Sequence, residues 1–294
     1  MKRIFSTVSF KDFIFIYTGI FLNRVLGKFR FHSYYSPLYN LIRHYDQKDY
    51  NLRKNGKSLQ VSGKDEYEGL EFLLRPGTSD SLVFEQVIVE KEYLPLIDII
   101  NKNAATKIET IIDAGANVGF ATIFLKKYFS KAKVVCVEAD PDNSKQLSKN
   151  VSLNRFDNDV HVLNVALWTS DNESLIIKRD FRDGDSWSIR VAPHSSNQNS
   201  NDTKIKCVTL QSIAKEYSLP LIDILKMDIE GAEAELFKNS EFINFLSERV
   251  RFCAIEFHEE VCSKSSLEAI LNKNHFEIIT DKETHFCINT RLKK

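Results

Sequence analysis

Short apolar runs alternate with helical and polar segments from residue 110 to the end of the chain. A short, near-continuous apolar run is typical of a strand that is buried on both faces of a sheet, and the intervening segments place apolar residues at helical spacing. The pattern predicts an α/β fold with a doubly wound, Rossmann-like, seven-stranded sheet, mostly parallel and ending in a C-terminal antiparallel hairpin. The predicted strands are residues 110–114, 133–137, 161–168, 221–226, 250–260, 275–280 and 285–291, with further short strands at 175–178 and 205–210.

The first third of the chain has a different pattern. Residues 10–29 carry apolar side chains at helical spacing, residues 31–60 predict a loop-bearing connector, and residues 57–74 predict a β-hairpin. We therefore expect an N-terminal basic appendage of helical and β structure over residues 1–74, and a sheet-forming domain over residues 75–294.

The charge distribution separates the same two parts. The 294 residues include 40 basic and 40 acidic side chains, which argues against wholesale nucleic-acid binding, so no nucleic-acid partner is expected. Residues 1–60 nevertheless hold eleven Lys or Arg against three Asp and no Glu, a net charge of +8. Two interpretations of residues 1–30 stay open: a helix that docks on the protein or on a second copy, and an interfacial helix that makes peripheral membrane contact.

The five cysteines are widely spaced and form no CxxC pair. They are typical of small buried hydrophobic residues in a reducing compartment, rather than of a disulfide framework or a zinc site. A cytoplasmic location is therefore expected, with the inner membrane face as the place of any peripheral contact. The sequence does not determine the oligomeric state.

The segment that follows the strand at residues 110–114 carries the first candidate chemistry. Its sequence is DAGANVG, and a turn of this kind needs positive φ or close approach by a ligand at positions that Gly and Asn tolerate. The next strand ends at Glu138, whose carboxylate can accept both hydroxyls of a ribose. This is the pattern of a βαβ nucleotide site. The residues expected at the nucleotide are Asp113, Gly115, Ala116, Asn117, Gly119, Glu138 and Ala139, with Ala166 beside an adenine ring.

Two cofactors compete for this site. A dinucleotide fingerprint requires G-x-G-x-x-G, whereas the register starting at Gly115 places Asn117 at the second glycine and Phe120 at the third. S-adenosylmethionine suits the turn better, because the turn can admit its amino-acid end and its sulfonium. A nicotinamide-dependent enzyme stays as the alternative.

Polar side chains follow two of the later strands. Asp228 and Glu230 follow the strand at residues 221–226, and His258 lies near the end of the strand at residues 250–260. Because open α/β sheets bind ligands beyond the carboxyl ends of their strands, these side chains are expected to face the same crevice. Asp228 is the first candidate general base, His258 the second, and Glu230 is expected to position the acceptor.

The neighbouring charged residues are expected to have structural roles. Glu233 and Glu235 are suited to cap the following helix and to complement its dipole. Lys226 could stabilise an alkoxide, but a lysine at a strand end is more often solvated. No metal is expected, because Asp228 and Glu230 lack a clear third ligand.

Five stretches, IIDAGANVGFATIFL, VVCVEADP, VTLQSIAKEY, IDILKMDIEGAEAELF and AIEFH, together resemble the FkbM-type family of S-adenosylmethionine-dependent methyltransferases. The resemblance covers roughly residues 75–260 and leaves the first 60 residues outside. It implies the class I methyltransferase version of the doubly wound fold. It also implies that the residues at 113, 115, 117 and 119 form the cofactor turn, that Glu138 binds ribose, that Ala166 lies near adenine, and that Asp228 to Glu230 line the methyl-transfer site.

The sequence thus favours an S-adenosylmethionine-dependent O-methyltransferase that acts on a hydroxyl of a sugar, a glycan or a small metabolite. Two alternatives belong to other classes. One is the nicotinamide-dependent enzyme, and the other is a non-catalytic adaptor that works through the basic N-terminal segment.

Overall fold

The computed structural model describes residues 14, 18, 41, 49–103, 107–178, 190–193, 203–258 and 263–292. The chain divides into two compact units, unit 1 with residues 1–92 and 148–156, and unit 2 with residues 93–147 and 157–294. Helical residues that follow residue 74 pack with the N-terminal strands within unit 1, and the domain boundary expected at residue 74 stays a prediction. Phe84, for example, lies edge-on to Tyr50 and Phe72, with ring centroids 5.4 and 5.1 Å away.

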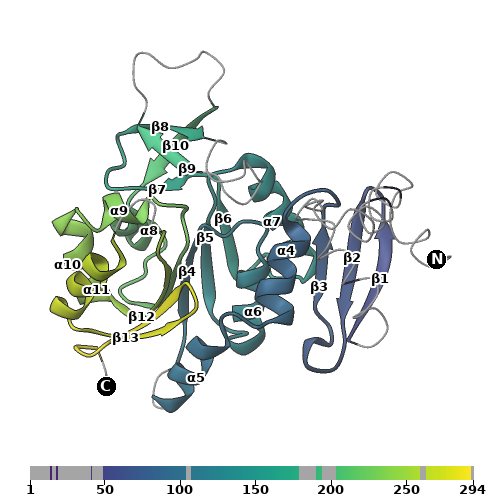
Figure 1. The fold of residues 1–294 in the computed structure, drawn as a ribbon, viewed down its shortest axis with the longest axis horizontal. Coiled ribbons are helices and arrows are strands. Elements are labelled where there is room, and N and C mark those ends of the chain that lie inside the picture. Colours follow the sequence, from purple (N-terminus) through teal and green to yellow (C-terminus); the bar gives the residue numbers. More distant parts are fainter. Residues whose placement is uncertain are drawn as a thin grey trace. The chain divides into compact units, whose positions relative to one another are not determined.

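Unit 1 is built on a three-stranded antiparallel sheet (Figure 1). The predicted hairpin is confirmed as the pairing of its second and third strands, whereas the first strand lies in the stretch predicted to be a connector. A two-residue turn, Gly56-Lys57, joins the first two strands, and Gly56 at its first position has φ +60°, which glycine adopts without steric cost. The elements are β1 (Tyr50–Asn55), β2 (Ser58–Gly63), the 3-10 turn η2 (Asp65–Tyr67), β3 (Glu71–Leu74), α4 (Asp80–Phe84) and the π-helical segment η3 (Glu85–Val89).

Two asparagines cover the free edge of β3. The backbone N–H groups of Glu71 and Leu73 donate to the side-chain oxygens of Asn154 and Asn150, at 2.9 and 2.7 Å. The two side-chain amides donate in return to the carbonyl oxygens of Glu71 and Leu73, at 2.7 and 3.3 Å. These amides satisfy backbone groups that a neighbouring strand would otherwise pair, which is why residues 148–156 belong to unit 1.

Unit 2 contains the seven-stranded sheet, in the order β13-β14-β12-β11-β4-β5-β6. The five strands β12, β11, β4, β5 and β6 run parallel to one another, and β14 is antiparallel to both β12 and β13. The predicted fold class is therefore confirmed. The strands are β4 (Thr110–Ala114), β5 (Lys133–Val137), β6 (Val160–Leu163), β11 (Ile222–Met227), β12 (Val250–Glu256), β13 (Phe276–Asp281) and β14 (Thr284–Asn289).

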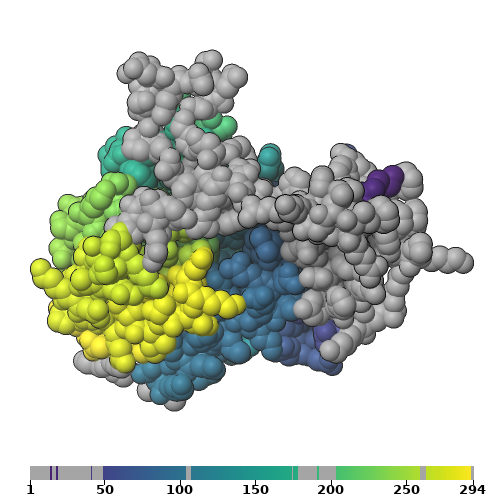
Figure 2. Space-filling model, viewed as in Figure 1, coloured from purple at the N-terminus to yellow at the C-terminus, as the bar shows by residue number. Residues whose placement is uncertain are grey.

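Helices cover both faces of this sheet. Figure 1 shows α8, α10 and α11 on one side and α5 and α6 on the other, and Figure 2 shows the C-terminal segment, in yellow, at the surface of the unit. Alternate strand residues such as Ile112, Leu225 and Cys253 form one core with the apolar sides of α8, α10 and α11. The helices are α5 (Leu94–Lys102), α6 (Phe120–Tyr128), α7 (Pro141–Leu153), α8 (Leu210–Glu216), α9 (Glu233–Leu236), α10 (Ser240–Arg249) and α11 (Lys264–Lys273).

A second, four-stranded sheet of unit 2 corrects the predicted third strand. Residues 161–168 do not form one strand: β6 ends at Leu163 in the main sheet, and the next strand, which contains Ala166, pairs with β10 instead. The small sheet has the order β7-β10-β8-β9, and its core includes Ala232 and contacts Ile229. Its strands are β7 (Ala166–Leu167), β8 (Ser174–Lys178), β9 (Arg190–Pro193) and β10 (Thr203–Val208).

Four cysteines, at positions 136, 207, 253 and 287, are buried and carry free thiols, as predicted, and Cys262 lies outside the described residues. No helix in the described part of the chain combines the length and the apolar character needed to cross a membrane. The predicted helix at residues 10–29 lies outside the described residues apart from positions 14 and 18, so its membrane or docking role stays a prediction.

Candidate active site

The turn between β4 and α6 uses three left-handed residues. Gly115, Asn117 and Gly119 have φ values of +73°, +50° and +87°. Asn tolerates this region better than most residues with a side chain, which explains why it can replace glycine at the middle position. The turn is tied to the end of β5, because the N–H groups of Gly115 and Ala116 both donate to the carbonyl oxygen of Val137, at 2.9 and 3.0 Å.

Glycine is required at position 115 because the end of β11, the neighbouring strand in the sheet, lies very close to it. A Cβ atom at this position would lie 1.6 Å from the carbonyl oxygen of Asp228, so any side chain would push the end of β11 away. Gly119 has a different role, since a Cβ there would lie 2.3 Å from a methyl carbon of Leu147 on α7. Gly115 therefore lets the turn lie against the end of β11, and Gly119 lets the start of α6 pack closely against α7.

Asp113 supports the turn from behind. Its side chain is fully buried, and one oxygen accepts a 2.6 Å hydrogen bond from the hydroxyl of Thr122. The other oxygen lies 3.5 Å from the ammonium of Lys226. Lys226 is also buried, so the expectation that it is solvated is wrong, and it donates a 2.6 Å hydrogen bond to the carbonyl oxygen of Gly115. These buried charges hold β4, the turn and β11 together.

Glu138 lies beside the turn, as the sequence predicts. One carboxylate oxygen accepts the N–H of Asn117 at 2.7 Å and the other accepts the N–H of Asp140 at 2.8 Å. Burial nevertheless raises the pKa of Glu138 to about 7. The side-chain oxygen of Asn117 is buried and has no hydrogen-bond partner among the described residues. A polar ligand at this turn would therefore find a carboxylate and a free amide oxygen as acceptors.

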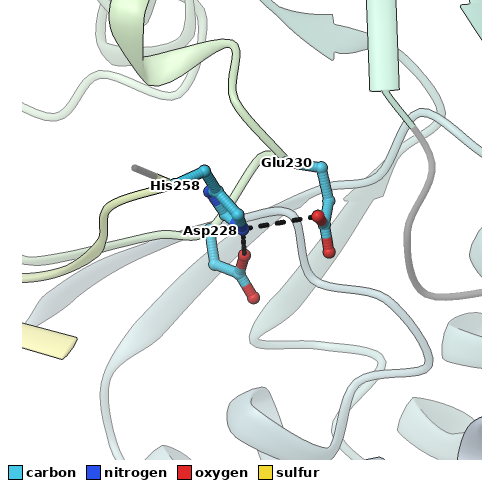
Figure 3. Close-up of side chains that lie close together, drawn as sticks. All are labelled: Asp228, Glu230 and His258. Atoms are coloured by element: carbon cyan, nitrogen blue, oxygen red, sulfur yellow. Dashed lines mark ion pairs between the residues drawn. The ribbon is translucent and has the colours of Figure 1, made fainter. Parts of the chain in front are cut away.

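Asp228, Glu230 and His258 come together at the carboxyl ends of β11 and β12, as predicted. Figure 3 shows the three side chains pointing toward one another. The Nε2 atom of His258 lies 3.3 Å from an oxygen of Glu230 and 3.9 Å from an oxygen of Asp228. Glu256 adds a further carboxylate, 3.7 Å from the same nitrogen, which the sequence analysis did not assign. Its position at the carboxyl end of β12, two residues before His258, is the signal that could have revealed it.

Glu233 fixes the turn that carries two of these residues. Its carboxylate accepts the N–H groups of Ile229 and Gly231, at 2.6 and 2.7 Å. Both residues precede α9, and no side chain of the described residues caps that helix, so the predicted capping role of Glu233 is wrong and its carboxylate closes the turn instead. The same carboxylate lies 3.5 Å from the Nδ1 atom of His258. Glu230 lies between the two bonded N–H groups and has φ +54°, a strained conformation for a residue with a long side chain. Glu233 thus orients both the turn and the imidazole ring.

The carboxylates control the charge of His258. Burial opposes the charged form, but the hydrogen bonds of Glu230 and Glu233 outweigh it and raise the pKa of His258 to about 11. An imidazole that holds its proton at neutral pH must release it before it can accept another, and the role of His258 as the second general base stays a prediction. Among the cluster, the side chain of Asp228 is the most accessible, at 27% exposure.

The structure also places the two alanines that were expected near a base. Ala166 is buried in the core of the small sheet, and Ala139, next to Glu138, packs against the same cluster together with Ile229. The cluster lies between the predicted ribose site and the turn after β11. Ala116 is buried within the cofactor turn and contributes through its backbone.

The sheet order, the glycine turn between its central strands and the acidic strand ends define a Rossmann-like methyltransferase of class I. The chain belongs to the FkbM methyltransferase family, because the family model described as "Methyltransferase FkbM domain" matches residues 113–279, more than half of its length. Membership of this family decides against the nicotinamide-dependent alternative.

Similar proteins include methyltransferases from distant sources. Methyltransferase sdnD of Sordaria araneosa is 26% identical over 196 residues, which cover 58% of this chain and 75% of that protein. Methyltransferase FkbM from Methylobacillus flagellatus KT matches with 16% identity and a TM-score of 0.41, over 62% of this chain and 44% of that chain. The N-terminal domain of human METTL16 in complex with SAH matches with 16% identity and a TM-score of 0.40, over 67% of each chain. The chain thus spans less than half the length of the M. flagellatus protein.

Proposed function

We propose that this protein is an S-adenosylmethionine-dependent O-methyltransferase that acts on a hydroxyl of a sugar, a glycan or a small metabolite. The observation that carries the proposal is the juxtaposition of two features. The left-handed turn beside Glu138 suits a nucleoside with an amino-acid end. The backbone carbonyl of Asp228 lies directly against that turn, and the side chain of the same residue is partly exposed.

The donor groups at the turn fit this cofactor. Glu138 retains lone pairs for two ribose hydroxyls, because each of its oxygens accepts one backbone N–H from the described residues. The buried amide oxygen of Asn117 can accept a hydrogen bond from a cationic amino group. The apolar cluster with Ala139 and Ala166 offers small side chains beside which a base can lie. When bound, S-adenosylmethionine supplies a methyl group on a sulfonium, which becomes a neutral thioether after transfer.

The chain's own residues must remove the proton of the acceptor hydroxyl. As the hydroxyl oxygen forms its new bond to carbon, its proton passes to a base, and a positioned carboxylate typically contributes on the order of 10²–10⁴-fold to the rate. Asp228 is the candidate, because it is the most accessible acid of the cluster and lies against the cofactor turn. Glu230 is suited to position the acceptor. Holding acceptor and methyl donor in line is expected to supply most of the remaining acceleration.

Calorimetric titration with S-adenosylhomocysteine and, separately, with NAD tests the cofactor. We expect saturable binding of S-adenosylhomocysteine alone. Binding of neither compound would favour the adaptor that works through residues 1–60, and binding of NAD alone would refute the proposed cofactor.

Labelled S-adenosylmethionine, offered with panels of hydroxylated sugars, glycans and small metabolites, tests the acceptor class. We expect the label to appear as an O-methyl ether in at least one panel. Transfer only to nitrogen or sulfur acceptors would contradict O-methylation while leaving the cofactor assignment intact.

A further inference from the structure

We infer that Asp228, Glu230 and His258 form a binding site for a divalent cation such as Mn²⁺, placed where the acceptor hydroxyl reacts. The inference rests on the proposed function only for its consequence in catalysis. The geometry does not depend on that function, and it identifies His258 as the third ligand beside Asp228 and Glu230.

The three side chains offer suitable ligand atoms at suitable distances. One oxygen of Asp228, one oxygen of Glu230 and one nitrogen of His258 all lie within 4.8 Å of one another. Ligand atoms about 2.1 Å from a common ion lie roughly 3 to 4 Å apart, so small side-chain movements would bring the three onto one cation. Carboxylate oxygens suit Mn²⁺, and an imidazole nitrogen is also an accepted ligand of such ions once the cation has displaced its proton to solvent. The Asp228 oxygen that faces His258 is buried and accepts no hydrogen bond from any described residue.

The surroundings of His258 are those of a metal ligand. Glu233 faces the Nδ1 atom at 3.5 Å, which leaves the Nε2 atom directed at Asp228 and Glu230. A carboxylate that holds the far nitrogen of a ligating histidine is a common second contact in metal sites, where it fixes the ring and raises its basicity. Glu233 is itself fixed by the N–H groups of Ile229 and Gly231. The site is therefore oriented before any ligand arrives.

A fourth oxygen is within reach, and one side of the site is open. Glu256 lies 3.7 Å from Nε2 of His258, on the same side as the other two acids. Asp228 is partly exposed, so an incoming hydroxyl can approach from its side. A cation in this place would bind the acceptor oxygen and lower its pKa, so that its proton leaves more readily during attack. Asp228 would then hold the cation with one carboxylate oxygen and take the proton with the other.

Binding of Mn²⁺ to the chelator-treated full chain at pH 8 tests the site, with free Mn²⁺ measured by electron paramagnetic resonance. We expect one Mn²⁺ per chain. Glu230→Gln and His258→Gln should each weaken the affinity by about 10- to 100-fold, since each removes a ligand. Glu235→Gln is the matched control, because this exposed carboxylate pairs with Lys238 on the neighbouring surface, and it should bind Mn²⁺ as the unchanged chain does.

Absence of stoichiometric Mn²⁺ binding to the unchanged chain, with and without S-adenosylhomocysteine, would overturn the inference. Equal affinity in Glu230→Gln, His258→Gln and the control would do the same. Thermal unfolding by circular dichroism checks each variant, and Asp228→Asn, at the most accessible ligand, replaces any variant that does not fold. Calorimetry with S-adenosylhomocysteine on the same samples separates the two proposals, because the cofactor can bind without Mn²⁺ and Mn²⁺ can bind without the cofactor.

Discussion

The proposed ribose contact of Glu138 predicts that cofactor affinity depends on pH, in a direction set by the pKa of that carboxyl group. Burial raises its pKa from 4.5 to about 7 in the free protein. In the proposed complex the ribose hydroxyls donate hydrogen bonds to the ionised carboxylate, so we expect the ionised form to bind the cofactor better. Affinity for S-adenosylhomocysteine should therefore rise from pH 6 to pH 8 and level off above it.

The magnitude follows from the ionised fraction. With a pKa of about 7, roughly a tenth of the carboxyl groups are ionised at pH 6 and about nine-tenths at pH 8. The apparent dissociation constant scales inversely with the competent fraction, so affinity should increase by about tenfold, or about 1.4 kcal/mol. The stability of the cofactor-free protein should have the opposite slope. The folded state keeps the Glu138 proton between pH 4.5 and about 7 whereas the unfolded chain loses it, so unfolding becomes easier as pH rises through that window.

Calorimetric titrations at pH 6, 7 and 8 measure this effect. Glu138→Gln cannot ionise, so its affinity should be independent of pH and about 1.5 kcal/mol weaker than that of the unchanged chain at pH 8. Asp142→Asn, at an exposed acid of the same region, is the matched control and should keep the full pH dependence. Equal affinities at pH 6 and pH 8 in the unchanged chain, or an undiminished slope in Glu138→Gln, would refute the reasoning.

Three further predictions concern other contacts. Gly115→Ala should lower the free energy of unfolding by more than the roughly 1–2 kcal/mol that a left-handed alanine costs, and it should weaken S-adenosylhomocysteine binding. Gly69 has φ +83° with open space around it, so Gly69→Ala should lose only that conformational part; urea unfolding measures both variants. Asp228→Asn should bind S-adenosylhomocysteine normally and lose about 10²–10⁴-fold in turnover with any identified acceptor; full turnover would remove Asp228 from the reaction. Asn239→Ala should destabilise the fold by about 1 kcal/mol with unchanged cofactor affinity, because the Asn239 side chain caps α10 by accepting two N–H groups.

Much of the fold was predictable because burial leaves a local pattern. The strands that became β4, β5, β11 and β12 are mostly apolar and are buried at nearly every position, as expected for a parallel strand that is covered on both faces. The third strand failed because an apolar run does not tell which sheet it joins. The polar Asn164 lies between β6 and β7, and the residues on its two sides pair in different sheets.

The candidate site, like the fold, was predictable from the sequence in part. Sequence by itself determined the turn, because only residues that tolerate positive φ can occupy positions 115, 117 and 119, and it placed Asp228, Glu230 and His258 in one crevice, because parallel strands end at one edge. Only the tertiary structure decided what each charge does. Lys226 is buried against Asp113, and Glu233 orients His258, because an ion pair depends on distances between strands that no local pattern of residues encodes.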